Sequence, residues 1–228
     1  MNQSQTVATE PLKAVVFDMD GLMFNTELLY PKVATILLER RNRRLSQDLT
    51  DNMMGKTHRD AFEVMIQFHG LTDSVDQLAD ESDVIFEDIL DAELAPMPGL
   101  MELLDSLEQA NLPKAVATSA RRVMAEDLLS RYGLNSRFAS ILCGDEVTSG
   151  KPAPEIYLTT AEKLGLHPSQ IMILEDSQTG CKAAVASGAF VVAVPGDHSR
   201  NHDFQGAAIV ADTLADARIY QALCLQES

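Results

Sequence analysis

The feature that most constrains the fold is a short apolar segment that ends abruptly at two carboxylates and a glycine. Residues 14–17 read AVVF, and Asp18, Met19, Asp20 and Gly21 follow directly. Such a run predicts a buried parallel strand, and open α/β sheets bind ligands at the carboxyl ends of their strands. Because a buried carboxylate without a partner is costly to keep charged, the two aspartates predict a bound cation, and an oxygen-rich shell suits Mg²⁺. The alternative is a solvated Asp-x-Asp-Gly turn after an ordinary strand.

The composition excludes several classes of protein. Of the 228 residues, 46% are hydrophobic and 23% are charged, which is typical of globular proteins. No apolar run reaches the roughly 18 residues of a membrane span, so no membrane partner is expected. The formal charge of −16 argues against a nucleic-acid partner. It also means that an anion site must be built locally, from a metal, a lysine and helix N-termini.

The cysteines and the first residues bear on the compartment. Cys143, Cys181 and Cys224 are odd in number and form no C-x-x-C pair, which argues against a disulfide framework and a zinc knuckle. Residues 1–12 lack a basic region followed by an apolar core, so we expect a flexible tail and no secretory signal. We therefore expect a cytoplasmic protein. For its oligomeric state, the sequence does not distinguish a monomer from a weak dimer.

A long stretch without a strand signal predicts an inserted domain. From residue 28 to about residue 94, apolar residues recur only at helical spacing. These roughly 70 residues are too many for a crossover in a compact sheet. We predict a small all-helical domain over residues 25–95, inserted into a core formed by residues 13–24 and 96–228.

After residue 96, helix and strand patterns alternate to the end of the chain. This alternation predicts βαβ units and hence an α/β fold with a doubly wound, mostly parallel sheet. A last helix is expected at residues 214–223. Further strands are expected at residues 115–118, 140–143, 171–174, 190–194 and 208–210.

Side chains that carry chemistry follow other predicted strands. Thr118 and Ser119 precede a helix, which suits an anion site or an ordinary N-cap. Lys151 lies in the segment GKPAP, where two prolines stiffen the chain. It is either a solvated lysine or a fixed cation that faces a phosphoryl group. Glu175 and Asp176 follow the strand at 171–174. Two acidic strand ends in one sheet repel unless they share a cation, which strengthens the Mg²⁺ prediction.

Taken in order, these segments resemble the four motifs of the haloacid dehalogenase-like superfamily. The helical insert resembles the small C1-type cap of its branch of β-phosphoglucomutase-like proteins and sugar-phosphate phosphatases. The resemblance covers roughly residues 13–223. The matching segments are DMDG at residues 18–21, Thr118, Lys151 in GKPAPEIY, and Glu175 and Asp176 in ILEDSQTG.

The resemblance implies a role for each of these residues in phosphoryl transfer. Asp18 would be the nucleophile that becomes an aspartyl phosphate, and Asp20 would be the general acid and then the general base. Thr118, Ser119 and Lys151 would bind the phosphoryl oxygens.

The implied metal is Mg²⁺, and the implied function is hydrolysis of small phosphate monoesters, such as phosphosugars or phosphorylated nucleosides. Asp18, the backbone carbonyl of Asp20 and Asp176 would hold the ion. Glu175 would be a further ligand of the ion, or it would orient one of the other ligands without touching the ion.

Two other functions stay open. The mutase branch carries a cap histidine at the position of Tyr30 and a cap arginine at the position of His58, so we favour hydrolysis over β-phosphoglucomutase-type chemistry. Arg59 lies next to that second position and could restore a cation. Asn25 replaces an aspartate usual in the branch, which bears on the hinge contacts. The third function is sugar-phosphate binding on an inactive scaffold, against which the intact motif residues argue.

Substrate specificity is expected from the inserted domain. The alternative is that the candidate contact residues, named at the end of this paragraph, are only the solvated start of a helix. For His198 and His202 we expect a surface loop in place of a metal pair. The candidate contacts are Lys56, Thr57, His58 and Arg59.

Overall fold

The computed structural model describes residues 10–53 and 56–225. Residues 1–9 of the expected tail lie outside this part. The chain divides into two compact units, which we call the core unit, Met1–Asn25 with Pro96–Ser228, and the inserted unit, Thr26–Ala95.

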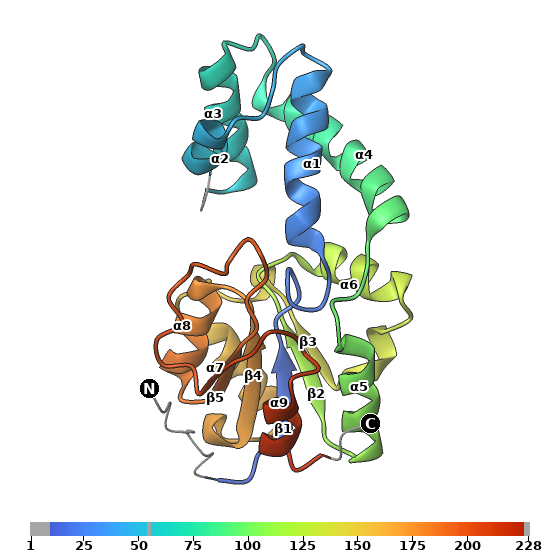
Figure 1. Cartoon of the computed structure of the whole chain (residues 1–228), viewed down its shortest axis with the longest axis vertical. Coiled ribbons are helices and arrows are strands. Elements are labelled where there is room, and N and C mark those ends of the chain that lie inside the picture. Colours follow the sequence, from blue (N-terminus) through green and yellow to red (C-terminus); the bar gives the residue numbers. More distant parts are fainter. Residues whose placement is uncertain (1–9, 54–55, 226–228) are drawn as a thin grey trace. The chain divides into compact units, whose positions relative to one another are not determined.

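The core unit is built on a parallel sheet with the strand order β3-β2-β1-β4-β5-β6 (Figure 1). Val16 of β1 pairs with Ala115 of β2 on one side and with Ile173 of β4 on the other. The strand order reverses beside β1, where open α/β sheets form their ligand crevice. The strands are β1 Ala14–Phe17, β2 Lys114–Ala117, β3 Ser140–Leu142, β4 Ile171–Glu175, β5 Phe190–Ala193 and β6 Ile209–Val210.

Both faces of this sheet are covered. Every residue of β1, β2, β4 and β5 is buried, and successive residues of a strand point to opposite faces. Tyr157 and Cys181 of the helices pack into one buried apolar cluster with Val16 and Ile173 of the sheet. The predicted α/β class with a doubly wound, mostly parallel sheet is therefore confirmed. The helices of the core unit are α5 Leu100–Gln109, α6 Arg122–Arg131, α7 Glu155–Lys163, α8 Gln178–Ser187 and α9 Ala217–Ala222.

The last helix is shorter than the prediction over residues 214–223. The carboxylate of Asp216 accepts a hydrogen bond from the backbone N–H of Arg218 at 2.9 Å, so the helix begins after residue 216.

In the inserted unit the described elements are helices. Arg41, which follows α1, donates from Nη2 to Asp73 at 2.8 Å and to Glu81 at 2.6 Å, and so ties the end of α1 to α4 and the segment before it. The helices are α1 Thr26–Glu39, α2 Gln47–Met53, α3 His58–His69 and α4 Val75–Glu93. Among the described residues of both units, no helix has the length and apolar character that crossing a membrane requires.

Candidate active site

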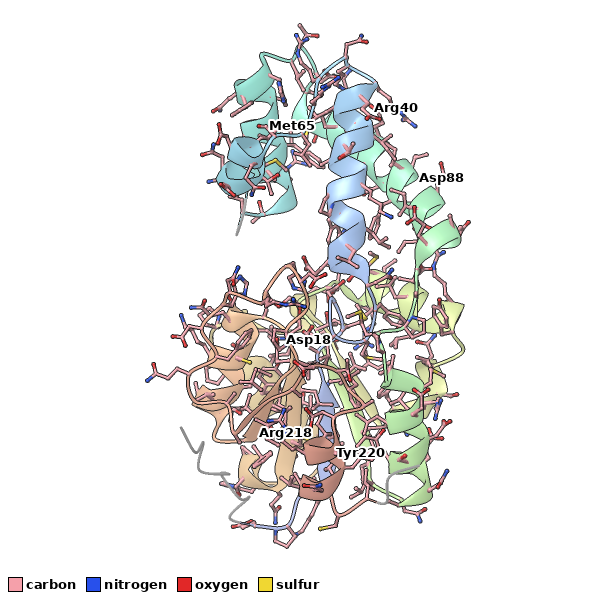
Figure 2. All side chains as sticks on the ribbon, in the orientation of Figure 1. Asp18, Arg40, Met65, Asp88, Arg218 and Tyr220 are labelled. Carbon is pink, nitrogen blue, oxygen red and sulfur yellow. The ribbon has the colours of Figure 1, made fainter. Side chains whose placement is uncertain are left out.

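The two predicted acidic strand ends meet. Asp18 lies at the carboxyl end of β1 (Figure 2), where its backbone N–H donates to the carbonyl of Leu174 in β4 at 3.0 Å. Asp18, Glu175 and Asp176 are 7%, 0% and 2% exposed. One carboxylate oxygen from each lies within 4.8 Å of the others, so the three can share one cation.

Lys151 supplies a buried positive charge to this cluster. Its Nζ lies 2.5 Å from Oδ1 of Asp18 and 2.7 Å from Oε1 of Glu175, and it donates to the carbonyl of Ala117 at 3.1 Å. Its side chain is 6% exposed, so it is not a solvated loop lysine.

Protein groups hold both carboxylate oxygens of Glu175. Oε1 accepts from Lys151 and, at 2.7 Å, from the hydroxyl of Tyr157 in α7. Oε2 accepts from the backbone N–H and the hydroxyl of Ser177 at 3.1 and 3.0 Å. Glu175 is thus suited to orienting its neighbours. The sequence analysis missed Tyr157, which looks like an ordinary core residue of a helix.

Asp20 sits in a different environment from Asp18. The turn after β1 places Gly21 at a φ of 79°, and the N–H of Gly21 donates to the carbonyl of Phe24 at 2.9 Å. Asp20 is partly exposed, and its Oδ2 accepts from the Thr118 hydroxyl at 3.4 Å. One carboxylate is therefore buried beside a lysine and the other is accessible to water.

The N-cap alternative is wrong for Thr118 and Ser119, because Arg121 is the N-cap residue of α6, and the anion-site alternative stays a prediction. The buried hydroxyl of Thr118 reaches Asp20 and also accepts from the backbone N–H of Ala120 at 3.0 Å, as a turn-stabilising side chain does. Ser119 is exposed. The backbone of Ser119 passes so close to Gly144 that a Cβ on Gly144 would lie 2.2 Å from the carbonyl oxygen of Ser119.

Burial and charge act in opposite directions on this cluster. Burial raises the pKa of Asp18 well above its ordinary value, which Lys151 only partly offsets while the neighbouring carboxylates raise it further. Burial alone would lower the pKa of Lys151, but Asp18 and Glu175 hold it above its ordinary value. Burial and the neighbouring carboxylates therefore disfavour the ionised form of Asp18, whereas the carboxylates favour the charged form of Lys151.

The sequence analysis did not predict that His198 contacts the acidic cluster. His198 and His202 lie in an exposed loop, as expected, but Nε2 of His198 is 2.8 Å from Oδ2 of Asp176. The sequence feature that could have predicted this contact is the position of His198 shortly after β5. Because β4 and β5 are adjacent parallel strands, they end at the same edge of the sheet.

The four predicted specificity residues belong to the inserted unit, at the start of α3. Lys56 is exposed. Thr57 is the N-cap and accepts from the N–H of Asp60 at 3.2 Å, and Arg59 pairs with Asp76 at 2.8 Å. The side chain of His58 lies outside the described residues.

Comparisons with known proteins agree on one family. The family described as haloacid dehalogenase-like hydrolase matches residues 15–194. A "Phosphorylated carbohydrates phosphatase" of Thermotoga maritima is 31% identical over 78% of this chain and 82% of its own length. A "(DL)-glycerol-3-phosphatase 2" of Arabidopsis thaliana is 32% identical over 79% and 78%. A crystal structure of a HAD family hydrolase from Deinococcus radiodurans with bound phosphate and sodium aligns with a TM-score of 0.79, at 26% identity, over 96% of this chain and 99% of that one.

Proposed function

Because the chain belongs to the haloacid dehalogenase-like hydrolase family, we propose that it is a Mg²⁺-dependent phosphatase of small phosphate monoesters. Phosphosugars and phosphorylated nucleosides are the substrates we favour. The observation that carries the proposal is the buried cluster of Asp18 and Asp176, at the carboxyl ends of β1 and β4, with Lys151 beside Asp18. The phosphatases among its relatives support the same reaction class.

The donor set fits Mg²⁺. Hard carboxylate oxygens are the ligands this ion prefers. Three buried carboxylates facing one lysine carry an excess of negative charge that a divalent ion would balance. Asp18, the backbone carbonyl of Asp20 and Asp176 would hold the ion, with Glu175 behind them. When bound, it neutralises charge on the phosphoryl oxygens.

In the first step, a carboxylate oxygen of Asp18 attacks the phosphorus atom in line with the leaving group. The bond between phosphorus and the ester oxygen breaks, and Asp20 gives its proton to the departing alcohol. Asp18 becomes an aspartyl phosphate. The Thr118 hydroxyl and the Lys151 ammonium donate to the phosphoryl oxygens throughout, which is where most of the rate gain of such reactions arises.

In the second step, the ionised Asp20 takes a proton from water as the water oxygen attacks phosphorus. The bond between phosphorus and Asp18 breaks, inorganic phosphate leaves, and both carboxyl groups return to their starting states. The partial exposure of Asp20 suits a residue that exchanges protons with an alcohol and with water.

The inserted unit is the proposed source of specificity, through Lys56, Thr57, His58 and Arg59. The cytoplasmic location and the monomeric or weakly dimeric state stay predictions.

The test is phosphate release from a panel of sugar phosphates, nucleotides and small phosphorylated metabolites, with Mg²⁺ or with EDTA. We expect Mg²⁺-dependent release that Asp18→Asn abolishes and that Asp80→Asn, at an exposed position of α4, leaves unchanged. Conversion of glucose 1-phosphate to glucose 6-phosphate with little phosphate release would instead support the mutase. No turnover of any compound would contradict both.

A further inference from the structure

The loop that follows β5 is fastened at two points to the segment that leads from the end of β4 into α8. The backbone N–H of Val194 donates to the carbonyl of Glu175 at 2.7 Å. Nine residues later, the backbone N–H of Asp203 donates to Oε1 of Gln178 at 3.3 Å. The loop therefore follows the segment that carries Asp176.

Local geometry within this loop directs the ring of His198. The backbone N–H of Ser199 donates to the carbonyl of Gly196 at 3.2 Å, and Ser199 itself is fully buried. A Cβ on Gly196 would lie 3.0 Å from Nδ1 of His198, so the ring packs against a residue without a side chain. The opposite nitrogen, Nε2, then faces Asp176.

We propose that His198 is a positioning residue that fixes the orientation of Asp176 for the divalent cation. Its Nε2–H donates to Oδ2 of Asp176 at 2.8 Å, so Oδ1 would be the oxygen available to hold the cation. The side chain of Asp176 is 3% exposed, so this bond also replaces hydration that the carboxylate has lost. The proposal rests on the proposed Mg²⁺ site.

This role differs from that of a metal ligand and from that of a loop anchor. As a ligand, His198 would turn Nε2 away from Asp176 toward the ion. As a loop anchor, it would affect folding and leave the intrinsic affinity for the metal unchanged. As a positioning residue, it acts through one hydrogen bond, so a replacement that keeps a donor at this place preserves much of the effect.

The test is isothermal titration of Mg²⁺ into the full chain without substrate. We compare the wild type with His198→Gln, which keeps an N–H donor, and His198→Leu, which keeps most of the volume and removes the donor. Loss of such a supporting bond weakens metal binding about 10- to 100-fold. We expect that loss for His198→Leu and a clearly smaller one for His198→Gln. His202→Ala, at an exposed position of the same loop, is the matched control and should bind as the wild type does.

Thermal unfolding in EDTA separates this effect from loss of the fold. In activity assays, His198→Leu should raise the Mg²⁺ concentration for half-maximal rate about tenfold or more, whereas kcat at saturating Mg²⁺ should change far less. Folded Leu and Gln variants with equal Mg²⁺ affinity would overturn the proposal, as would a Leu variant that binds like the wild type. If the wild type binds Mg²⁺ and hydrolyses no ester, the proposed function fails while a weaker Leu variant still supports the role of His198. If the wild type binds no Mg²⁺, both fail.

Discussion

Gly180 approaches Glu175 so closely that a Cβ on Gly180 would lie 1.6 Å from Oε1 of Glu175. Gly180 lies in the first turn of α8, where its N–H donates to the Ser177 hydroxyl at 3.0 Å. The carboxylate cannot move aside, because Lys151 and Tyr157 hold the same oxygen from other directions. The helix that follows β4 can therefore begin beside the acidic cluster only if this position has no side chain.

We expect Gly180→Ala to destabilise the protein. In a helix, this change usually stabilises by roughly 0.5–1 kcal/mol. Here the added methyl group displaces Glu175, and overpacking of this kind costs about 1–3 kcal/mol. Urea denaturation measures the difference, with Lys182→Ala, at an exposed position of the same helix, as the control. A Gly180→Ala variant as stable as the wild type would contradict the close approach.

Lys151→Met should weaken both the fold and the activity. The change leaves Asp18 and Glu175 buried without their ammonium partner, which costs about 3–5 kcal/mol when one member of a buried pair is removed. Loss of a fixed cation at the phosphoryl group should lower kcat about 10²- to 10³-fold. Denaturation in EDTA and phosphate release measure the two effects, with Lys182→Met as the exposed control.

A second change tests whether the lost stability comes from the uncompensated charge. Adding Glu175→Gln to Lys151→Met removes one of the two carboxylates, so the double variant should recover part of the stability. Strictly additive losses would contradict this explanation.

The sheet and most of the acidic cluster were predictable from the sequence for a physical reason. Short apolar runs that end in carboxylates, such as residues 171–174 before Glu175, locate the carboxyl ends of buried strands. In a parallel sheet those ends share one edge, so Asp18 and Glu175 had to approach each other.

Contacts that depend on the path of a loop or on the far end of a side chain were not predictable. The loop with His198 has no periodicity, and its course is set by hydrogen bonds to Glu175 and Gln178. Tyr157 fits the apolar pattern of a helix, and nothing in that pattern says that its hydroxyl reaches Glu175. Both residues contact the acidic cluster, although the sequence analysis gave neither of them a role in it.

The start of α3 allows stability and specificity to be separated. Thr57→Ala removes the N-cap bond to the N–H of Asp60 and should lower stability by about 1 kcal/mol. Lys56 is exposed, so Lys56→Ala should change stability by no more than about 0.5 kcal/mol. If Lys56 contacts substrate, the same variant should raise KM. Denaturation and steady-state kinetics test both, and an unchanged KM for every substrate would remove Lys56 from the specificity residues.

Asp18 should make the metal-free protein less stable as the pH rises. Burial raises the pKa of Asp18 in the fold, so its ionised form is disfavoured there relative to the unfolded chain. The resulting destabilisation begins near the ordinary aspartate pKa of about 4 and grows until the pH exceeds the raised value. Asp18→Asn, which stays neutral, should therefore melt at a higher temperature than the wild type at pH 7 in EDTA. The gain should disappear as the pH falls to about 4.

Asp216 provides a control of opposite sign. Hydrogen bonds from Arg218, at 2.9 Å from Nε and 2.6 Å from Nη2, lower the pKa of Asp216, so its ionised form stabilises the fold (Figure 2 labels Arg218). That contribution is complete above the ordinary pKa and is lost as the pH falls through the lowered value. Asp216→Asn should thus melt at a lower temperature than the wild type at pH 7, and the difference should shrink on acidification. Thermal unfolding in EDTA tests the pair, between pH 7 and about pH 4 for Asp18→Asn and at pH values below the ordinary aspartate pKa of about 4 for Asp216→Asn. An Asp18→Asn variant that is less stable than the wild type at pH 7, or whose gain persists at pH 4, would show that Lys151 outweighs burial at Asp18.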